Sequence, residues 1–268
     1  MPELPEVEAV CRRLAPVVTG KSIRAVHVLR ATPLKPQRPA TLVKLAGGRK
    51  IRAIRRRGKN ILIDLAGGHT LRVHLRMTGE LYAEPGEPTL SPAVRIWFEL
   101  SGGASLVFRD SRALGRLSIG TTEEIEQKLA GLGPEPLGPG FLRKDFVADA
   151  AGSRLPAKQY LMDQKRIAGL GNIYAAEALF RAEIDPRKPM CELSPNRLSA
   201  LYSAMRLVLR QAVKSATIAY KRPGIYRKSD FNRFVYGRAG EPCVACGDEI
   251  RRIPQAGRST YYCPHCQR

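Results

Sequence analysis

Two pairs of cysteines near the C-terminal end constrain the fold more than any other feature of the chain. Cys243-x2-Cys246 and Cys263-x2-Cys266 are separated by sixteen residues. Two such pairs at this spacing are typical of tetrahedral zinc coordination, and the residues between them suit a β-hairpin. Four protein ligands leave no open position on the ion, so the pattern predicts one structural Zn²⁺. A redox dithiol is the alternative, and the spacing disfavours it.

The charge balance indicates a polyanionic partner. The chain has 45 Lys and Arg residues against 24 Asp and Glu, which gives a formal net charge of +21. Nucleic acid is the usual partner of such a chain, because basic side chains release the counterions condensed on phosphate. Seven of the eleven residues in 49–59 are basic, which adds to this interpretation. An anionic membrane would favour a basic helix with bulky apolar anchors, and the sequence shows no clear one.

The location of the protein is predicted to be intracellular. The sequence contains neither a run of eighteen apolar residues nor the apolar region of a secretory signal. Four of the six cysteines are clustered at metal spacing, which does not resemble a disulfide framework. Cys11 and Cys191 stand alone and are interpreted as a buried or a tolerated surface thiol. We therefore expect a monomer with no membrane attachment, cytoplasmic or nucleoid-associated if the source is bacterial.

The apolar pattern divides the chain into a helix followed by strands. Apolar residues at helical spacing over 3–18 predict a first helix. From 21 to 119 the pattern shortens and alternates, with strand candidates at 71–75, 94–98 and 105–108. This part of the chain is typical of an antiparallel β-sandwich.

A composition shift near residue 131 predicts the end of the first domain. Residues 131–140 are seven-tenths Gly and Pro, which is typical of a linker. A short helix over 122–130 precedes it, and helical patterns follow it, including one that Ser194 and Pro195 begin. We predict an α+β protein in four parts: a β-sandwich with flanking helices (1–131), a linker (132–142), a helical domain (143–236) and a zinc finger (237–268).

The N-terminal segment offers an amine beside two carboxylates. Removal of Met1, which a small second residue permits, would leave Pro2 with a secondary amine whose pKa is about 8. Such an amine can attack a sugar C1′ to form an iminium, which acidifies the C2′ proton and permits elimination of phosphate. Glu3 and Glu6 are one helical turn apart and could move the protons. The alternative is an ordinary helix start, because Pro and Glu are both favoured there.

Two further segments suggest contacts with anions. Residues 158–177 predict a helix, a glycine turn and a second helix that begins near Asn172, whose amide groups would face an anion. The expected hairpin between the cysteine pairs carries Arg251, Arg252 and Arg258. Each of these features alone is also compatible with an ordinary helical hairpin or a solvated surface charge.

As an ordered set, these segments resemble the formamidopyrimidine-DNA glycosylase/endonuclease VIII family, and the opening is closer to the formamidopyrimidine branch. The resemblance spans nearly the whole chain. It is carried by MPELPEVE at 1–8, RGK at 57–59, HLRMTG at 74–79, GLGNIYAAEALF at 169–180, YGRAGEPCVAC at 236–246 and CPHC at 263–266.

The resemblance implies a bifunctional DNA glycosylase and AP lyase of base excision repair. It acts on double-stranded DNA with oxidised bases or abasic sites, and it includes a helix–two-turn–helix motif in the helical domain. By this resemblance Pro2 is the Schiff-base nucleophile, Glu3 the acid/base, Glu6 its support and Lys59 a contact to the lesion and its phosphate. The residues implied to bind phosphates around the extruded nucleotide are His74, Lys158, Asn172 and Arg258.

The resemblance also assigns the residues that fill the space left by a flipped base. Met77 matches one of them, and the loop at 110–115 supplies Arg112 opposite the orphaned base and Leu114 where phenylalanine is usual. Leucine can still wedge a base step, although it stacks less well. Residues 214–235 depart from the glycine- and threonine-rich loop of the formamidopyrimidine branch, and they include the basic residues Lys221, Arg222, Arg227 and Lys228.

Two alternatives remain open at this point. An enzyme of the endonuclease VIII type, with a preference for oxidised pyrimidines or hydantoins over 8-oxoguanine, would differ only in the lesion pocket. A non-catalytic zinc-dependent protein that binds damaged DNA would share the charge and the four cysteines but would need no nucleophile.

Overall fold

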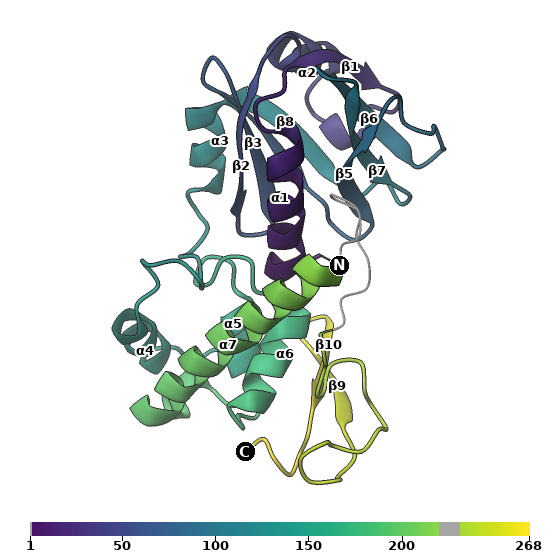
Figure 1. Cartoon of the computed structure of the whole chain (residues 1–268). Helices are drawn as coiled ribbons and strands as arrows, with labels where there is room; N and C mark the ends of the chain where they lie inside the picture. The colour runs from purple at the N-terminus through teal and green to yellow at the C-terminus, as the bar shows by residue number, and fades with distance from the viewer. Residues whose placement is uncertain (1, 220–230) are drawn as a thin grey trace. The chain divides into compact units, whose positions relative to one another are not determined.

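The computed structural model describes residues 2–219 and 231–268, which form two compact units (Figure 1). The first unit holds the chain up to Gly131 together with the last turns of the helix α7 (Pro195–Ala219), from Val213 on. The second unit holds Leu132–Ala212 and the C-terminal segment. Because α7 contributes to both units, the boundaries of the four predicted parts stay a prediction. Among the described residues, each helix is too short or too polar to cross a membrane.

Two four-stranded antiparallel sheets form the first unit, as the alternating segments predicted. Their strand orders are β1-β6-β7-β5 and β2-β3-β4-β8. Apolar side chains from both sheets fill one core, because every second residue of each strand points inward. The strands are β1 (Ile23–Val28), β2 (Ile51–Arg57), β3 (Asn60–Leu65), β4 (His69–His74), β5 (Gly79–Pro85), β6 (Val94–Leu100), β7 (Ala104–Asp110) and β8 (Arg116–Thr121).

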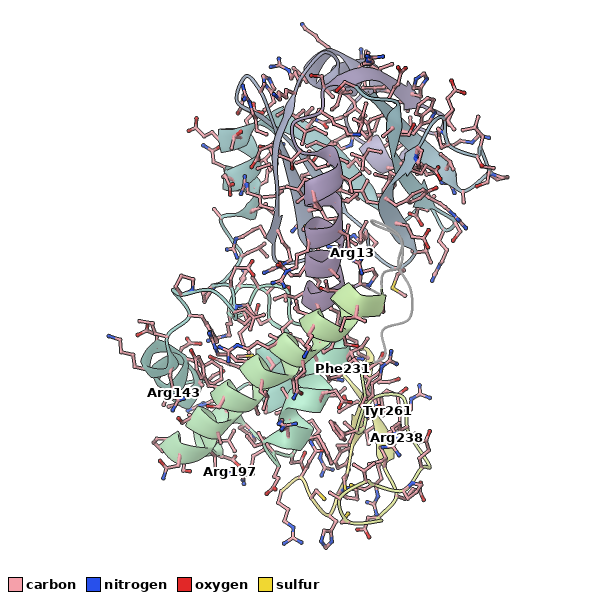
Figure 2. The ribbon with its side chains drawn as sticks, viewed as in Figure 1. Arg13, Arg143, Arg197, Phe231, Arg238 and Tyr261 are labelled. Carbon is pink, nitrogen blue, oxygen red and sulfur yellow. The ribbon has the colours of Figure 1, made fainter. Side chains whose placement is uncertain are left out.

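Helices cover the edges of these sheets. α1 (Leu4–Val18) contacts the edge strands β2 and β5, and α2 (Pro39–Ala46) contacts the edge strands β1 and β8 (Figure 1). The predicted helices over 3–18 and 122–130 are confirmed as α1 and α3 (Thr122–Leu129). Arg13 of α1 also donates to the Thr217 carbonyl at the end of α7 (Figure 2).

The chain crosses between the two sheets twice at one end of the sandwich. It leaves β4 for β5 through residues 75–78, and it returns from β7 to β8 through residues 111–115. The two crossovers are neighbours, because His74 pairs with Arg116 in one sheet and Gly79 pairs with Asp110 in the other. The predicted base-replacing residues lie on these two crossovers.

The second unit is helical, as predicted. The glycine- and proline-rich segment packs on it: the Tyr202 hydroxyl donates to the Phe141 carbonyl at 2.6 Å, and Arg206 donates to the Pro136 carbonyl at 2.7 Å. A Cβ at Gly133 would lie 2.5 Å from backbone atoms of residues 165 and 166, so only glycine fits there. The remaining helices are α4 (Arg143–Ala151), α5 (Ala157–Met162) and α6 (Asn172–Arg181), with the short 3-10 helices η1 (Thr32–Leu34) in the first unit and η2 (Met190–Glu192) in the second.

The turns between α5 and α6 are organised by one side chain. Gln164 donates through Nε2 to the carbonyls of Met162 and Leu170, and its Oε1 accepts from the Gly169 amide. Gly169 has a φ of 84°, a conformation that favours glycine. This arrangement confirms the predicted helix, glycine turn and helix, and it sets the direction in which α6 begins.

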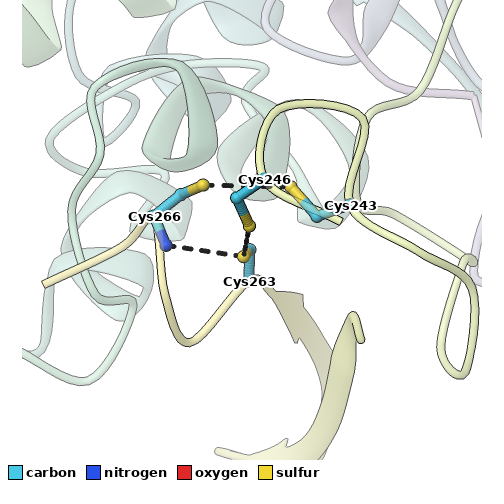
Figure 3. A group of neighbouring side chains, drawn as sticks. All are labelled: Cys243, Cys246, Cys263 and Cys266. Atoms are coloured by element: carbon cyan, nitrogen blue, oxygen red, sulfur yellow. Dashed lines mark hydrogen bonds between the residues drawn. The ribbon is translucent and has the colours of Figure 1, made fainter. Parts of the chain in front are cut away.

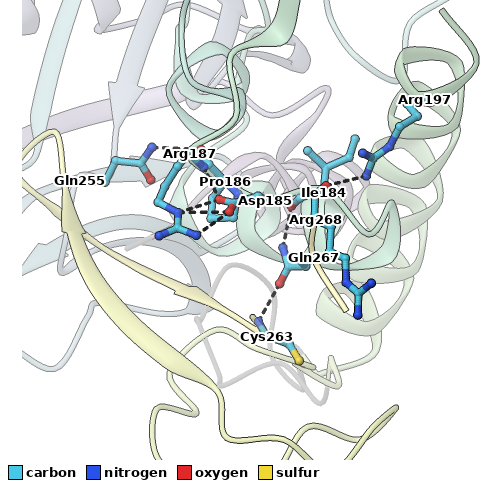
Figure 4. Close-up of polar contacts among 9 residues, drawn as sticks. All are labelled: Ile184, Asp185, Pro186, Arg187, Arg197, Gln255, Cys263, Gln267 and Arg268. Atoms are coloured by element: carbon cyan, nitrogen blue, oxygen red, sulfur yellow. Dashed lines mark hydrogen bonds and ion pairs between the residues drawn. The ribbon is translucent and has the colours of Figure 1, made fainter. Parts of the chain in front are cut away.

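The C-terminal hairpin consists of β9 (Arg251–Gln255) and β10 (Arg258–Tyr262) and lies between the cysteine pairs, as predicted. Polar contacts attach the hairpin and the residues that follow it to the loop after α6 (Figure 4). Gln267 donates to the Ile184 carbonyl at 2.9 Å and accepts from the Cys263 amide, and Gln255 donates to the Pro186 carbonyl at 3.0 Å.

A buried carboxylate on α6 also binds the segment that leads into the zinc finger. Glu177 of α6 is fully buried and accepts hydrogen bonds from the backbone amides of Phe234, Val235 and Tyr236. Burial raises the pKa of Glu177, while the three amide donors favour its charged form. The segment that leads into the zinc finger is therefore fixed to the helix.

Candidate active site and nucleic-acid interface

The predicted nucleophile and its two carboxylates lie at the start of α1. Pro2 is buried, and the side chains of Glu3 and Glu6 are 1% and 3% exposed. The Glu6 carboxylate accepts the Glu3 backbone N–H at 2.8 Å, which is one arm of a capping box. Helix starts normally keep such acids in solvent, so the burial of two carboxyl groups beside Pro2 exceeds what capping requires. Met1 lies outside the described residues.

Lys59 is placed by the tight turn between β2 and β3. Gly58 has a φ of 56°. Asn60, which is 4% exposed, holds the turn by hydrogen bonds. The Asn60 side chain donates to the Arg57 carbonyl at 3.0 Å and accepts from Arg72 Nε at 2.9 Å. The turn that carries Lys59 is thus tied to β4, the strand that ends at His74.

His74 lies beside a group of cations and is neutral at pH 7. Burial lowers its pKa from 6.5 to about 4, with further contributions from Arg76, Arg72 and Lys59. Its Nδ1 accepts the Arg76 backbone N–H at 3.1 Å, so the proton of the neutral ring lies on Nε2. His74 can therefore donate one hydrogen bond to an anion without carrying a charge.

The depressed pKa of His74 predicts a loss of stability in acid. Between pH 6.5 and pH 4 the unfolded chain binds a proton that the folded protein does not bind, so this residue destabilises the fold as the pH falls. At pH 5 the effect is about 2 kcal/mol. We expect His74→Gln to remove this part of the pH dependence, measured by urea unfolding at pH 7 and pH 5. Parallel pH profiles for the two proteins would contradict the shift.

The predicted base-replacing residues protrude from the two crossovers of the sandwich. Met77 is 46% exposed and Leu114 is 38% exposed, and Arg112, two residues before Leu114, is also exposed. The residues before the two apolar side chains, Arg76 and Ala113, have φ values of 56° and 54°. Exposed apolar side chains that follow strained residues are typical of a surface built for contact rather than for the core.

The second unit brings together the other predicted phosphate ligands. Lys158 is 2% exposed and donates through Nζ to the Ser259 carbonyl at 2.8 Å and to the Thr260 hydroxyl at 2.6 Å. Asn172 donates to the same Ser259 carbonyl at 3.0 Å, and its buried Oδ1 has no hydrogen-bond partner among the described residues. Exposed Arg258 is next to Ser259 and lines a pocket of about 210 Å³ with Lys158.

These contacts give Lys158 and Asn172 a structural role in the second unit. Lys158 and Asn172 both hold the backbone of β10, so they fix the position of Arg258 at the tip of the hairpin. Their own phosphate contacts stay a prediction. Arg258 is the exposed cation of this group, and it is the member best placed to meet a phosphate.

The four predicted zinc ligands form one cluster (Figure 3). Their sulfur atoms all lie within 4.8 Å of one another, with 3.9 Å between Cys243 and Cys266 and 3.4 Å between Cys246 and Cys263. Tetrahedral Zn–S bonds of about 2.3 Å place sulfur atoms about 3.8 Å apart, so the cluster fits a zinc ion. The backbone amides of Ala245 and Cys266 donate to the Cys243 and Cys263 sulfurs.

The two cysteines outside this cluster behave as predicted. Cys11 is buried against the sandwich, and burial raises the pKa of its thiol to about 12, so it is a poor nucleophile. Cys191 is exposed.

Several residues that organise the site were not identified from the sequence. Asn60, Asp110, Gln164 and Glu177 all use buried or partly buried polar groups to hold backbone turns. Asp110 lies in the loop at 110–115 that the resemblance assigned, and Glu177 lies in the segment 169–180 that carried it. A polar residue in such a segment was the available signal.

One unit combines buried carboxylates, a basic turn and protruding side chains on a β-sandwich, and the other carries a four-cysteine finger on helices. Together these features define a protein that processes nucleic acid. Residues 1–117 match the formamidopyrimidine-DNA glycosylase N-terminal domain, residues 132–222 its H2TH domain, and residues 240–268 the zinc finger found in FPG and IleRS. The chain belongs to the formamidopyrimidine-DNA glycosylase family. It is a DNA glycosylase of that family, with a zinc-finger domain.

Relatives and solved structures match over nearly the full length. The formamidopyrimidine-DNA glycosylase of Moorella thermoacetica is 42% identical over 94% of both chains, and that of Chloroflexus aurantiacus is 40% identical over 100% of this chain and 98% of its own. A complex of Lactococcus lactis Fpg with DNA containing an abasic site matches with a TM-score of 0.92, 30% identity and 100% coverage of both chains. A complex of a point mutant of that protein with DNA containing Fapy-dG matches with a TM-score of 0.90, 30% identity and 99% coverage of both chains.

Proposed function

We propose that the protein is a bifunctional DNA glycosylase and AP lyase that excises oxidised bases from double-stranded DNA. The observation that carries this proposal is the burial of Glu3 and Glu6 directly beside Pro2. A buried secondary amine next to two buried carboxylates is suited to covalent attack coupled to proton transfer. The Lactococcus lactis relatives form complexes with Fapy-dG DNA and with abasic-site DNA, which supports the same substrate class.

Pro2 and Glu3 carry the reaction, and Glu6 supports the proton transfers of Glu3. After removal of Met1, the Pro2 nitrogen attacks C1′ of the damaged nucleotide, the C1′–N bond to the base breaks, and the base leaves with a proton. Glu3 protonates the ring oxygen as the sugar opens, which leaves an iminium between Pro2 and C1′. Glu3 then accepts a C2′ proton, and the 3′ phosphate leaves by β-elimination. A second proton loss expels the 5′ phosphate by δ-elimination, and water releases the sugar remnant.

The remaining predicted residues bind and shape the DNA. Lys59 and His74 contact phosphate and lesion from the first unit, and Arg258 contacts phosphate from the second. Met77, Arg112 and Leu114 occupy the space that the flipped nucleotide leaves. One Zn²⁺ held by the four cysteines has a structural role, since it orders the hairpin that carries Arg258. We also propose that the protein acts as an intracellular monomer.

Borohydride trapping tests this function. The protein is incubated with duplexes that carry 8-oxoguanine, a formamidopyrimidine, a hydantoin, an oxidised pyrimidine or an abasic site, and the imine is reduced. We expect a covalent adduct with the abasic site and with at least one damaged base, and an undamaged duplex as the control gives none. The absence of an adduct at the abasic site, with Met1 shown by mass spectrometry to be removed, would leave a non-catalytic DNA-binding protein.

The same panel identifies the preferred lesion. Relatives named formamidopyrimidine-DNA glycosylase support formamidopyrimidines as the best substrates. A ranking led by oxidised pyrimidines or hydantoins would favour specificity of the endonuclease VIII type. The basic residues at 221, 222, 227 and 228, on which that alternative was based, lie outside the described residues.

A further inference from the structure

We propose that Asp110 is the positioning residue that joins the two crossovers of the sandwich into one preset wedge for the DNA duplex. This inference rests on the proposed function, since it concerns how the enzyme opens a base pair. The wedge consists of Met77 on the first crossover and Arg112 and Leu114 on the second. These side chains come from segments more than thirty residues apart in the sequence, and nothing in either segment alone fixes their spacing.

The Asp110 carboxylate contacts both crossovers. It is fully buried, and its Oδ1 accepts the Thr78 hydroxyl at 2.5 Å and the Arg112 backbone N–H at 3.2 Å. Its Oδ2 accepts the Gly115 N–H at 2.7 Å. Thr78 follows Met77 directly, and Arg112 and Gly115 bracket Leu114. The carboxylate is therefore hydrogen-bonded next to every residue of the wedge.

Backbone strain explains why the hydrogen bonds to Asp110 are needed. Among the described residues, four that are not glycine have a positive φ, and two of them are Arg76 and Ala113. Each stands immediately before a protruding side chain, Met77 or Leu114. Conformations of this kind persist only where the surroundings enforce them. The three hydrogen bonds to Asp110 supply that enforcement at the point where the two strained turns meet.

Close packing prevents the turns from moving independently of Asp110. A Cβ at Gly115 would lie 2.6 Å from Cζ of Phe108 and 3.1 Å from Oδ2 of Asp110, and a Cβ at Gly79 would lie 2.4 Å from the Leu75 carbonyl oxygen. Arg95 of β6 also holds the backbone at this point, since it donates to the Asp110 carbonyl at 2.7 Å. The hydrogen bonds to Asp110 thus fix the backbone positions from which the three wedge side chains project.

A preset wedge affects the stage at which the damaged base leaves the duplex. A flipped base leaves a gap in a duplex, and a wedge that already has the right shape fills it without further ordering. A single strand with an abasic site has neither a base pair to open nor a gap to fill. Loss of Asp110 should therefore impair base excision from a duplex far more than covalent chemistry at an abasic site in a single strand.

Asp110→Asn tests this distinction. The amide keeps the size of the side chain, but its NH₂ cannot accept the Gly115 N–H, or, if flipped, the Thr78 and Arg112 donors. The probes are a duplex with one formamidopyrimidine opposite cytosine and a single strand with an abasic site. We expect excision from the duplex to fall about 100-fold, while borohydride trapping on the single strand changes less than about threefold. An equal fall on both probes, or unchanged excision, would overturn the proposal.

Two further variants complete the design. Thr78→Val removes one of the three hydrogen bonds at constant shape, so it should lower the ratio of duplex excision to single-strand trapping in the same direction and by less. An unchanged ratio for Thr78→Val would also overturn the proposal, even if Asp110→Asn does not fold. Asp145→Asn makes the same chemical change at an exposed position of α4 and should leave the ratio unchanged. Failure of the unaltered protein to form any adduct would instead refute the proposed function.

Discussion

Retention of one residue ahead of Pro2 should abolish covalent trapping and strand cleavage. An extension converts the secondary amine into an amide, whose nitrogen lone pair is delocalised and cannot attack C1′. Removal of a nucleophile of this kind costs at least about a thousandfold in rate. Pro2→Gly should lose most of the activity as well, because a primary amine forms a neutral imine that must gain a proton before it becomes an electron-withdrawing iminium, and because glycine lacks the fixed geometry of the proline ring. Borohydride trapping and cleavage of an abasic duplex measure both effects.

A matched proline on the same helix separates chemistry from folding. Pro16 is exposed inside α1, and its replacement removes a proline without touching the buried start of the helix. We expect Pro16→Ala to keep full trapping activity, and we expect the Pro2 variants to keep their affinity for abasic DNA within about threefold, since few contacts change. If the Pro2 variants lost DNA affinity together with trapping, Pro2 would be a structural residue.

Local patterns in the sequence predicted the elements of the fold well. The apolar residues of 3–18 repeat with the helical period, and they became the buried face of α1. The strand candidates at 94–98 and 105–108 became β6 and β7, which are neighbours in one sheet. Such patterns report which side chains are buried, and burial determines the type of element. They carry little information on which strands become the edges of the two sheets. They therefore do not show where α1 and α2 pack, since both helices contact edge strands.

Polar residues with distant partners could not be predicted in the same way. Glu177 lies in a helix, where a glutamate normally faces solvent, yet it is fully buried because it accepts backbone amides 57 to 59 residues away. Lys158 is buried because its ammonium group meets a carbonyl 101 residues away. No local period records such pairings, since they depend on the tertiary fold that brings the partners together.

The residues of the candidate site also fall into two groups, those predictable from local sequence and those that depend on distant partners. The chemistry of Pro2 and of the four cysteines was visible in the sequence, because it depends on residue type and spacing. The side chains that aim this chemistry, such as Asn60 under the Lys59 turn, became visible only in the structure. A cluster of cysteines at metal spacing is the extreme case of a local signal.

Removal of the zinc ion should release the finger from the rest of the second unit and weaken DNA binding. The apolar cluster of the finger is small, with Val235, Ile250 and two of the cysteines packed against α6, so we expect a metal held by the four cysteines to supply most of its stability. Cys246→Ser removes one exposed ligand of the cluster. We expect loss of the bound zinc, rapid amide exchange in 240–268, and a loss of affinity for abasic duplex of about 10- to 100-fold as Arg258 loses its position.

An exposed cysteine elsewhere provides the control for this experiment. Cys191→Ser changes a thiol that lies outside the metal cluster, so zinc content and DNA affinity should stay unchanged. The β-sandwich has its own apolar core, and amide exchange in β3, β4 and β7 should therefore remain slow in Cys246→Ser. If exchange accelerated throughout the sandwich, the zinc ion would stabilise the whole chain. If Cys246→Ser kept both its zinc and its affinity, the four cysteines would not form the metal site that orders the DNA-binding hairpin.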